Sequence, residues 1–243
     1  MIFLYHMTLE RNKQVTVCAC ASRSFIQKEK VAKIAAAIKN DGYDVVIKAD
    51  LCREVMQKSP DMQDIAMGII LACYSRAIRS HFNWLGLIAN EIVDIRSKSC
   101  EEVLSRFNIS YLDSKDTNDF LKEINEFPVE NGTDAWYPVL DKEKCIECGK
   151  CHDFCLFGVY TIENKQVKVA QPQNCKNNCP ACARMCPNKA IIFPKYEKSP
   201  INGGTTEEEI FNPQEMDKMY RDRLQMRLKQ RRDGISLLKK DDK

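Results

Sequence analysis

The sequence lacks the motifs that mark most nucleotide-dependent enzymes. It contains neither the Gly-x-Gly-x-x-Gly fingerprint nor the Gly-x-x-x-x-Gly-Lys-[Ser/Thr] loop, so nucleotide binding has no support. The histidines His6, His81 and His152 are isolated and no nucleophile elbow is present, so no catalytic residues are predicted. No hydrophobic run approaches the length of a membrane span, and the apolar residues 2–5 are too few for a signal peptide. The expected protein is cytoplasmic and has no membrane span.

The net charge and the cysteine content narrow the class of protein further. A net charge of +3 over 243 residues is unremarkable, and no nucleic-acid partner is predicted. Thirteen cysteines, an odd number, without a signal peptide indicate a reducing compartment, where disulfides are rare.

Eight of the cysteines form two runs of four, with two- and three-residue gaps. Two-residue gaps let a turning backbone present three thiolates to one 4Fe–4S cube, while the fourth cysteine of each run faces away and reaches the other cube. The first predicted ligand set is Cys145, Cys148, Cys151 and Cys186. The second is Cys175, Cys179, Cys182 and Cys155. Zinc ribbons use two Cys-x-x-Cys pairs instead, so two 4Fe–4S clusters are the prediction.

Residues 136–196 resemble the bacterial two-cluster ferredoxin domain beyond the cysteines. Residues 137–141 resemble its entering strand, 158–162 and 166–169 its hairpin, and 188–193 its closing strand. The resemblance implies an α+β ferredoxin-like domain. Two departures stand out: Leu156 replaces the usual proline after the fourth cysteine, and the three-residue gap after Cys175 makes that residue the least regular ligand.

Residues 1–112 alternate short apolar runs with helical patterns. Expected strands lie at residues 15–20, 44–47, 68–72 and 92–95, and expected helices at 26–38, from 51, at 76–90 and at 100–107. Strands that alternate with helices predict a parallel sheet covered on both faces. The predicted fold class is therefore an α/β parallel-sheet domain, flavodoxin-like or doubly wound.

The remaining five cysteines follow the strands of this domain, where the carboxyl ends of a parallel sheet line one crevice. They are Cys18, Cys20, Cys52, Cys73 and Cys100. Predicted helix starts border them: capping boxes at residues 24–27 and 99–102, and Asp50 as an N-cap. Helix N-termini favour anionic thiolate sites, so a third cluster is possible here. Buried cysteines that simply fill strand ends are the alternative.

Residues 15–107 resemble the N-terminal domain of the heterodisulfide reductase A-subunit family. The likeness rests on residues 17–20 (Val-Cys-Ala-Cys), on Cys52, on residues 71–76 (Leu-Ala-Cys-Tyr-Ser-Arg) and on residues 90–100. The resemblance implies a third 4Fe–4S cluster on Cys52, Cys73, Cys100 and either Cys20 or Cys18. The family's flavin domain has no counterpart in this sequence, and the proline after the third-strand cysteine is missing.

The other segments are polar. Residues 113–135 are predicted to be a linker around one short helix, and residues 197–243 a C-terminal arm with a basic helix at 213–232. Met216, Tyr220, Leu224 and Leu228 form a narrow apolar stripe on that helix, which suits either a solvated arm or a docking helix.

The predicted function is that of an iron–sulfur subunit that relays single electrons within a larger oxidoreductase complex. Its expected partners are other redox subunits, a flavoprotein or a heterodisulfide-reductase-like complex. Two alternatives stay open: a small self-contained flavin or iron–sulfur oxidoreductase, and an iron–sulfur assembly or activation factor.

Overall fold

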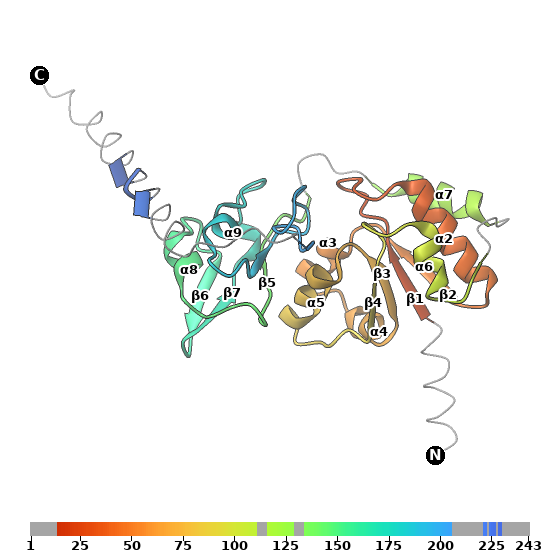
Figure 1. Cartoon of the computed structure of the whole chain (residues 1–243), viewed down its shortest axis with the longest axis horizontal. Helices are drawn as coiled ribbons and strands as arrows, with labels where there is room; N and C mark the ends of the chain where they lie inside the picture. Colours follow the sequence, from red (N-terminus) through yellow and green to blue (C-terminus); the bar gives the residue numbers. More distant parts are fainter. Residues whose placement is uncertain are drawn as a thin grey trace, which may run out of the picture.

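The computed structural model describes residues 14–110, 116–128 and 134–205, together with 221, 222, 224–226, 228 and 229. Its first half contains a sheet of four parallel strands in the order β2-β1-β3-β4. The strands are β1 (Gln14–Cys18), β2 (Asp44–Lys48), β3 (Ile69–Ala72) and β4 (Glu91–Asp94). This is the strand order with which flavodoxin-like sheets begin. The predicted parallel α/β domain is therefore confirmed (Figure 1).

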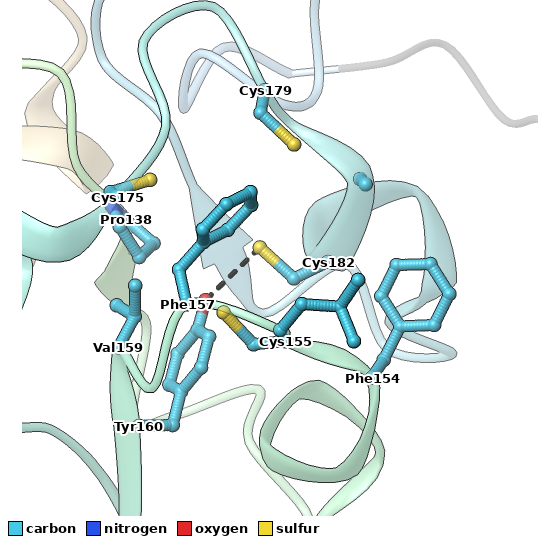
Figure 2. Close-up of a pocket in the computed structure, with 11 residues that line it drawn as sticks. Pro138, Phe154, Cys155, Phe157, Val159, Tyr160, Cys175, Cys179 and Cys182 are labelled. Atoms are coloured by element: carbon cyan, nitrogen blue, oxygen red, sulfur yellow. Dashed lines mark hydrogen bonds between the residues drawn. The ribbon is translucent and has the colours of Figure 1, made fainter. Parts of the chain in front are cut away.

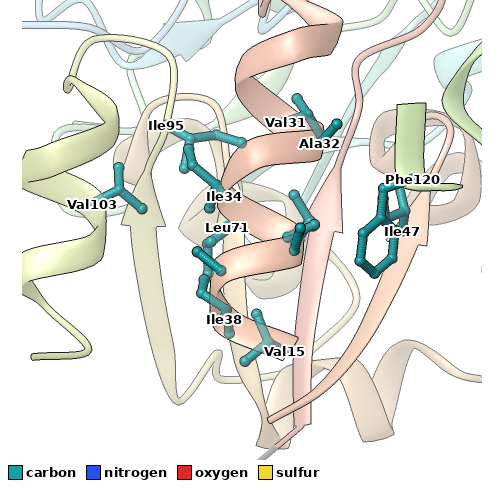
Figure 3. Close-up of a cluster of buried hydrophobic side chains, with 14 of the residues drawn as sticks. Val15, Val31, Ala32, Ile34, Ile38, Ile47, Leu71, Ile95, Val103 and Phe120 are labelled. Atoms are coloured by element: carbon teal, nitrogen blue, oxygen red, sulfur yellow. The ribbon is translucent and has the colours of Figure 1, made fainter. Parts of the chain in front are cut away.

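Helices cover both faces of this sheet, as the near-continuous apolar strands require. One face carries α2 (Lys28–Asn40), α6 (Cys100–Ser105) and α7 (Thr117–Glu126). The other carries α3 (Leu51–Gln57), α4 (Met62–Met67) and α5 (Ser75–Trp84). In the first layer, Ile34 and Ile38 of α2 lie against Val15 and Leu71 of the strands (Figure 3).

Helix α7 falls inside the segment predicted to be a linker. Its Phe120 and Ile124 are buried in the same apolar cluster as α2. The first domain therefore uses this helix to complete one face of its core. The local polarity of residues 113–135 could not reveal this role, because the helix presents only two buried side chains among many polar ones.

Of the three helix starts predicted from capping residues, one forms its cap as expected and two do not. The capping box at α6 forms as predicted between Ser99 and Glu102. The expected box at residues 24–27 does not form, because Ser24 has a φ of +52° and α2 starts only after Gln27. Asp50 does occupy the N-cap position of α3, but its side chain caps nothing and instead binds the second half of the chain.

The second half contains two small antiparallel sheets. Strand β5 (Val139–Leu140) pairs with β8 (Ile191–Ile192), and β6 (Tyr160–Glu163) pairs with β7 (Gln166–Val169). Strand β7 coincides with the predicted segment 166–169, whereas β5 and β8 are shorter and lie within the predicted segments 137–141 and 188–193. Strand β6 starts two residues later and ends one residue later than the predicted segment 158–162. The helices are α8 (Lys150–Phe154), α9 (Ala181–Met185) and the 3-10 turn η1 (Pro172–Asn174).

The two halves share a packed interface. Tyr137, Val139 and Ile192 of the second half belong to one apolar cluster with residues of α3, α4 and α5. At its edge the indole Nε1 of Trp84 donates to the carbonyl of Val169 at 2.9 Å, and Arg76 pairs with Asp141 at 2.6 Å. The halves are thus held against one another by both apolar and charged contacts.

Residues 197–205, predicted to belong to the C-terminal arm, also pack at this interface. Asn202 is fully buried. Gly203 has a φ of +96°, and a Cβ there would lie 2.9 Å from Cβ of Ala77 in α5, so both backbone conformation and close approach require glycine.

Only part of the predicted helix at 213–232 lies within the described residues. Residues 221, 222, 224–226, 228 and 229 are helical, and Leu228 of the apolar stripe is exposed. Met216 and Tyr220 lie outside the described residues, so docking stays a prediction. None of the helices that the structure describes is long and apolar enough to cross a membrane.

Candidate iron–sulfur sites

The first cavity lies between α8 and β8. All four cysteines of the first predicted set line it: Cys145, Cys148, Cys151 and Cys186. The rest of its wall is largely apolar and includes Leu140, Ile146, Val167 and Ile191. Its empty volume is about 340 Å³.

Tight turns direct the first three of these thiols to one place. Glu147 and Gly149 have positive φ values of 53° and 72°, so the chain reverses on either side of Cys148. Cys151 then sits in the first turn of α8. Residues with left-handed backbone conformation in the two-residue gaps therefore bring the three thiols to the same cavity.

The second cavity holds the second predicted set. Cys155, Cys175, Cys179 and Cys182 line it, and its empty volume is also about 340 Å³. Figure 2 shows their side chains among Phe154, Phe157, Val159 and Tyr160. The irregular gap after Cys175 is taken up by a turn in which Asn178 has a φ of +58°, so Cys175 still reaches the cavity.

Each short helix serves both cavities. Helix α8 carries Cys151 into the first cavity and is followed by Cys155 in the second. Helix α9 carries Cys182 into the second cavity and is followed by Cys186 in the first. This is the exchange of fourth ligands that the spacing predicts for paired 4Fe–4S clusters.

The chemistry of both cavities suits an iron–sulfur cluster. Burial raises the pKa of Cys151 and of Cys175 to about 12, so these thiols need a nearby positive charge in order to ionise. Within the described ranges, no group of three or more Cys, His, Asp or Glu side chains converges closely enough to hold a single metal ion. A cube binds each thiolate to a different iron atom, so its ligands need not converge on one point.

The structure gathers four of the five N-terminal cysteines. Cys18, Cys52 and Cys73 are buried in one apolar cluster, and Cys20 packs against it. Cys100 packs against the cluster on the opposite face of the sheet, and the charges that act on its pKa are those of Lys30, Glu101 and Lys33. Cys20 packs against both clusters, whereas Cys100 packs against a different cluster from the one that contains Cys52 and Cys73. The predicted set that combines Cys100 with Cys52 and Cys73 therefore stays a prediction.

A buried ion pair lies beside this cysteine group. Lys195, from the second half, binds the carboxylate of Asp50, and Ser22 hydrogen-bonds to the same pair. The side chain of Lys195 is only 2% exposed. Burial alone would lower the pKa of Lys195, but its interactions with Cys52 and with the carboxylate of Asp50 raise it. Sequence reasoning missed Lys195, since nothing around it marks a buried lysine.

A second buried polar pair joins the halves through Tyr137. Its hydroxyl donates to the carbonyl of Cys52 at 2.8 Å, so the contact of 3.1 Å with His81 requires the Nδ1–H of His81 to donate to the tyrosine oxygen. Burial lowers the pKa of His81 to about 3, and its Nε2 has no partner. His81 is thus a neutral core residue.

The lowered pKa of His81 predicts that the folded protein loses stability in mild acid. Its pKa is about 3 in the folded protein and 6.5 for an unperturbed histidine, so the unfolded chain binds more protons between these values. We expect the free energy of unfolding to fall by about 2 kcal/mol from pH 7 to pH 5, at about 1.36 kcal/mol per pH unit below the unfolded pKa. Urea midpoints at both pH values measure this loss. The His81→Gln variant should lose most of the dependence and the exposed His152→Gln should keep it; equal slopes in all three proteins would contradict the assignment.

Paired cavities, each lined by four cysteines in an apolar wall, define an iron–sulfur protein. No family model matches the chain. An uncharacterized ferredoxin of Methanocaldococcus jannaschii is 45% identical over 85 residues, which are 34% of this chain and 57% of that relative. Ferredoxin-3 of Nostoc sp. is 36% identical over 88 residues, 27% of this chain and 90% of that protein. The chain therefore belongs to the ferredoxin family, with about a third of its length or less in the matched part.

Subunits of larger assemblies are also among the relatives. The pyruvate synthase subunit PorD of Methanocaldococcus jannaschii is 36% identical over 74 residues, 29% of this chain and 84% of that protein. These similarities indicate iron–sulfur clusters and an electron-transfer role.

Proposed function

We propose that this protein is a two-cluster electron-transfer subunit that passes single electrons between redox partners. The observation that carries the proposal is the division of eight cysteines between two cavities, four in each. When bound, 4Fe–4S clusters supply one-electron redox chemistry. The chain's own residues hold the clusters through these thiols and surround them with apolar side chains such as Val167 and Val159, which limit access of water.

Iron content and reversible reduction test this proposal. The full chain, purified anaerobically, should contain at least about eight irons and give a dithionite-induced EPR signal that disappears on reoxidation. Four irons or fewer would overturn the two-cluster assignment. Clusters that cannot be reduced reversibly would favour an assembly factor, and a flavin spectrum in the purified protein would favour a self-contained oxidoreductase.

A third cluster in the α/β domain is the finer part of the proposal. The resemblance to the heterodisulfide reductase A-subunit domain motivates it, and the gathering of Cys18, Cys20, Cys52 and Cys73 supports a changed ligand set without Cys100. Cys175 of the second cavity packs against this same apolar cluster, which suits a relay that continues into the first domain.

Paired variants of the full chain test the third site. If the third cluster is present, the wild-type chain should bind about twelve irons. The Cys52→Ala variant should then bind about eight irons, and the Cys100→Ala variant should still bind about twelve. The full chain is needed because α7, Tyr137 and Lys195 complete the first domain and its interface. A wild-type content of eight would restrict the relay to two clusters, and a loss on Cys100→Ala would overturn the changed ligand set.

We further propose that the protein works inside a multi-subunit redox complex, with a flavoprotein or a heterodisulfide-reductase-like assembly as partner. The similarity to a pyruvate synthase subunit supports membership of a complex. Truncation after residue 205 tests the arm as the docking element: iron content should stay unchanged while co-purifying redox subunits are lost. Retention of those subunits would assign docking to another surface.

A further inference from the structure

The second cavity contains a hydroxyl group aimed at one of its sulfur atoms. Tyr160 lies on β6 with its side chain buried, and its Oη donates to Sγ of Cys182 at 3.1 Å (Figure 2). The ring lines the cavity wall beside Cys155, so the hydroxyl faces the thiols and is shielded from solvent. Spacing rules do not predict this contact, because it joins a strand residue to a helix 22 positions later.

The first cavity has a carboxylate in its ligand loop instead. Glu147 lies between Cys145 and Cys148, and its Oε2 accepts the backbone N–H of Val167, a residue of the cavity wall. After burial, which raises the pKa of Cys145, Glu147 acts on this thiol in two opposed ways: its backbone hydrogen bond lowers the pKa and its carboxylate charge raises it. Sulfurs of this cavity also accept backbone hydrogen bonds: Cys186 from the N–H of Ala190 at 3.3 Å, Cys145 from the backbone of Glu147 and Cys151 from that of His152.

The Tyr160 hydroxyl and the Glu147 carboxylate act in opposite directions on reduction. Reduction adds one electron and no proton to a cluster, and part of the added negative charge resides on its cysteine sulfurs. A donated O–H stabilises that charge, particularly in a buried site where the local dielectric is low. A nearby carboxylate repels it.

We propose that the Tyr160–Cys182 hydrogen bond and the Glu147 carboxylate set the two clusters to different reduction potentials, the second above the first. With both clusters bound, an electron that entered at the first would pass downhill to the second: the first would lose one electron and the second would gain it, with no bond broken. The second cavity is also the one whose Cys175 borders the α/β domain. This inference rests on the proposed two-cluster function and adds a direction to it.

Potentiometric titration of the full chain, followed by EPR, tests the inference. In Tyr160→Phe, the cluster of higher potential should become harder to reduce, by about tenfold in its redox equilibrium, which is 59 mV for one electron. In Glu147→Gln, the cluster of lower potential should become easier to reduce. Tyr137→Phe is the matched control, because it removes an equally buried hydroxyl that contacts Cys52 O and His81 and no cavity sulfur. It should leave both potentials unchanged.

Iron counting separates the two possible failures. A wild-type protein with fewer than eight irons contradicts the proposed function itself. Variants with full iron and unchanged potentials contradict only the inference, as would a shift of the same size in Tyr137→Phe. If Tyr160→Phe binds less iron, two other measurements test the inference. They are the potentials of Glu147→Gln and the magnetic coupling between the exchangeable hydroxyl proton of Tyr160 and the wild-type cluster. Absence of such a coupling, with no shift in Glu147→Gln, would overturn the inference.

Discussion

Combining Cys148→Ala with Cys186→Ala is expected to cost the protein only one cluster, leaving about four irons of eight. The two residues lie in the same cavity although they are 38 positions apart in the sequence. Combining Cys148→Ala with Cys155→Ala should instead abolish both clusters, because these neighbours in sequence line different cavities. Iron analysis and the EPR amplitude of the reduced proteins measure the difference.

This pair of double variants separates exchange of the fourth ligands from simple sequential ligation. If each run of four cysteines held its own cluster, the outcomes would be reversed: Cys148→Ala/Cys155→Ala would keep four irons and Cys148→Ala/Cys186→Ala would keep none. Because both proteins lack two cysteines, a general loss of folding cannot produce a contrast between them. His152→Gln, an exposed change inside the first run, should bind iron like the wild type.

The second large effect is expected from Lys195→Met, which should lower the free energy of unfolding by about 3–5 kcal/mol. The substitution leaves the carboxylate of Asp50 buried at the interface without its cation. Urea unfolding of the iron-loaded protein, followed by the loss of its visible absorbance, measures the change. Removing a buried partner costs far more than removing an exposed one, because the remaining charge cannot regain water.

Two further variants check the physical cause. Lys195→Met combined with Asp50→Leu removes both charges and should recover much of the loss. Lys168→Met breaks an ion pair whose side chains are 45% and 58% exposed, so its effect should stay below about 1 kcal/mol. Equal destabilisation by Lys195→Met and Lys168→Met would contradict a buried pair at the interface.

Local signals in the sequence predicted the features that local geometry controls. The grouping of Cys151 with Cys186, and of Cys182 with Cys155, follows from gap lengths, because short turns dictate where neighbouring thiols point. The parallel sheet was likewise predicted from a local signal, the alternation of strand and helix patterns along the sequence. The capping box of Ser99 and Glu102 needs only four consecutive residues, and it forms.

Contacts between distant segments account for what the sequence did not reveal. Asp50 has the sequence signature of an N-cap, but a lysine 145 positions later competes for its carboxylate. Cys100 follows a strand like its counterparts, yet it faces the opposite layer, because the strand rule does not fix the face to which the following loop turns. Helix α7 is polar in sequence, and only its packing on α2 makes it part of the core.

The shared helices α8 and α9 also bear on how firmly the two proposed redox centres would be held. Each helix carries the cysteine of one cavity, and the cysteine of the opposite cavity follows its last residue, four positions later in the sequence. Four helical residues span a rise of about 6 Å. The tunnelling gap between the centres is therefore built from single turns of helix rather than from a hinge. Internal electron transfer should accordingly be insensitive to solvent viscosity and to changes in the β6–β7 hairpin loop, whereas one residue inserted into α8 would turn Cys155 away from its cavity.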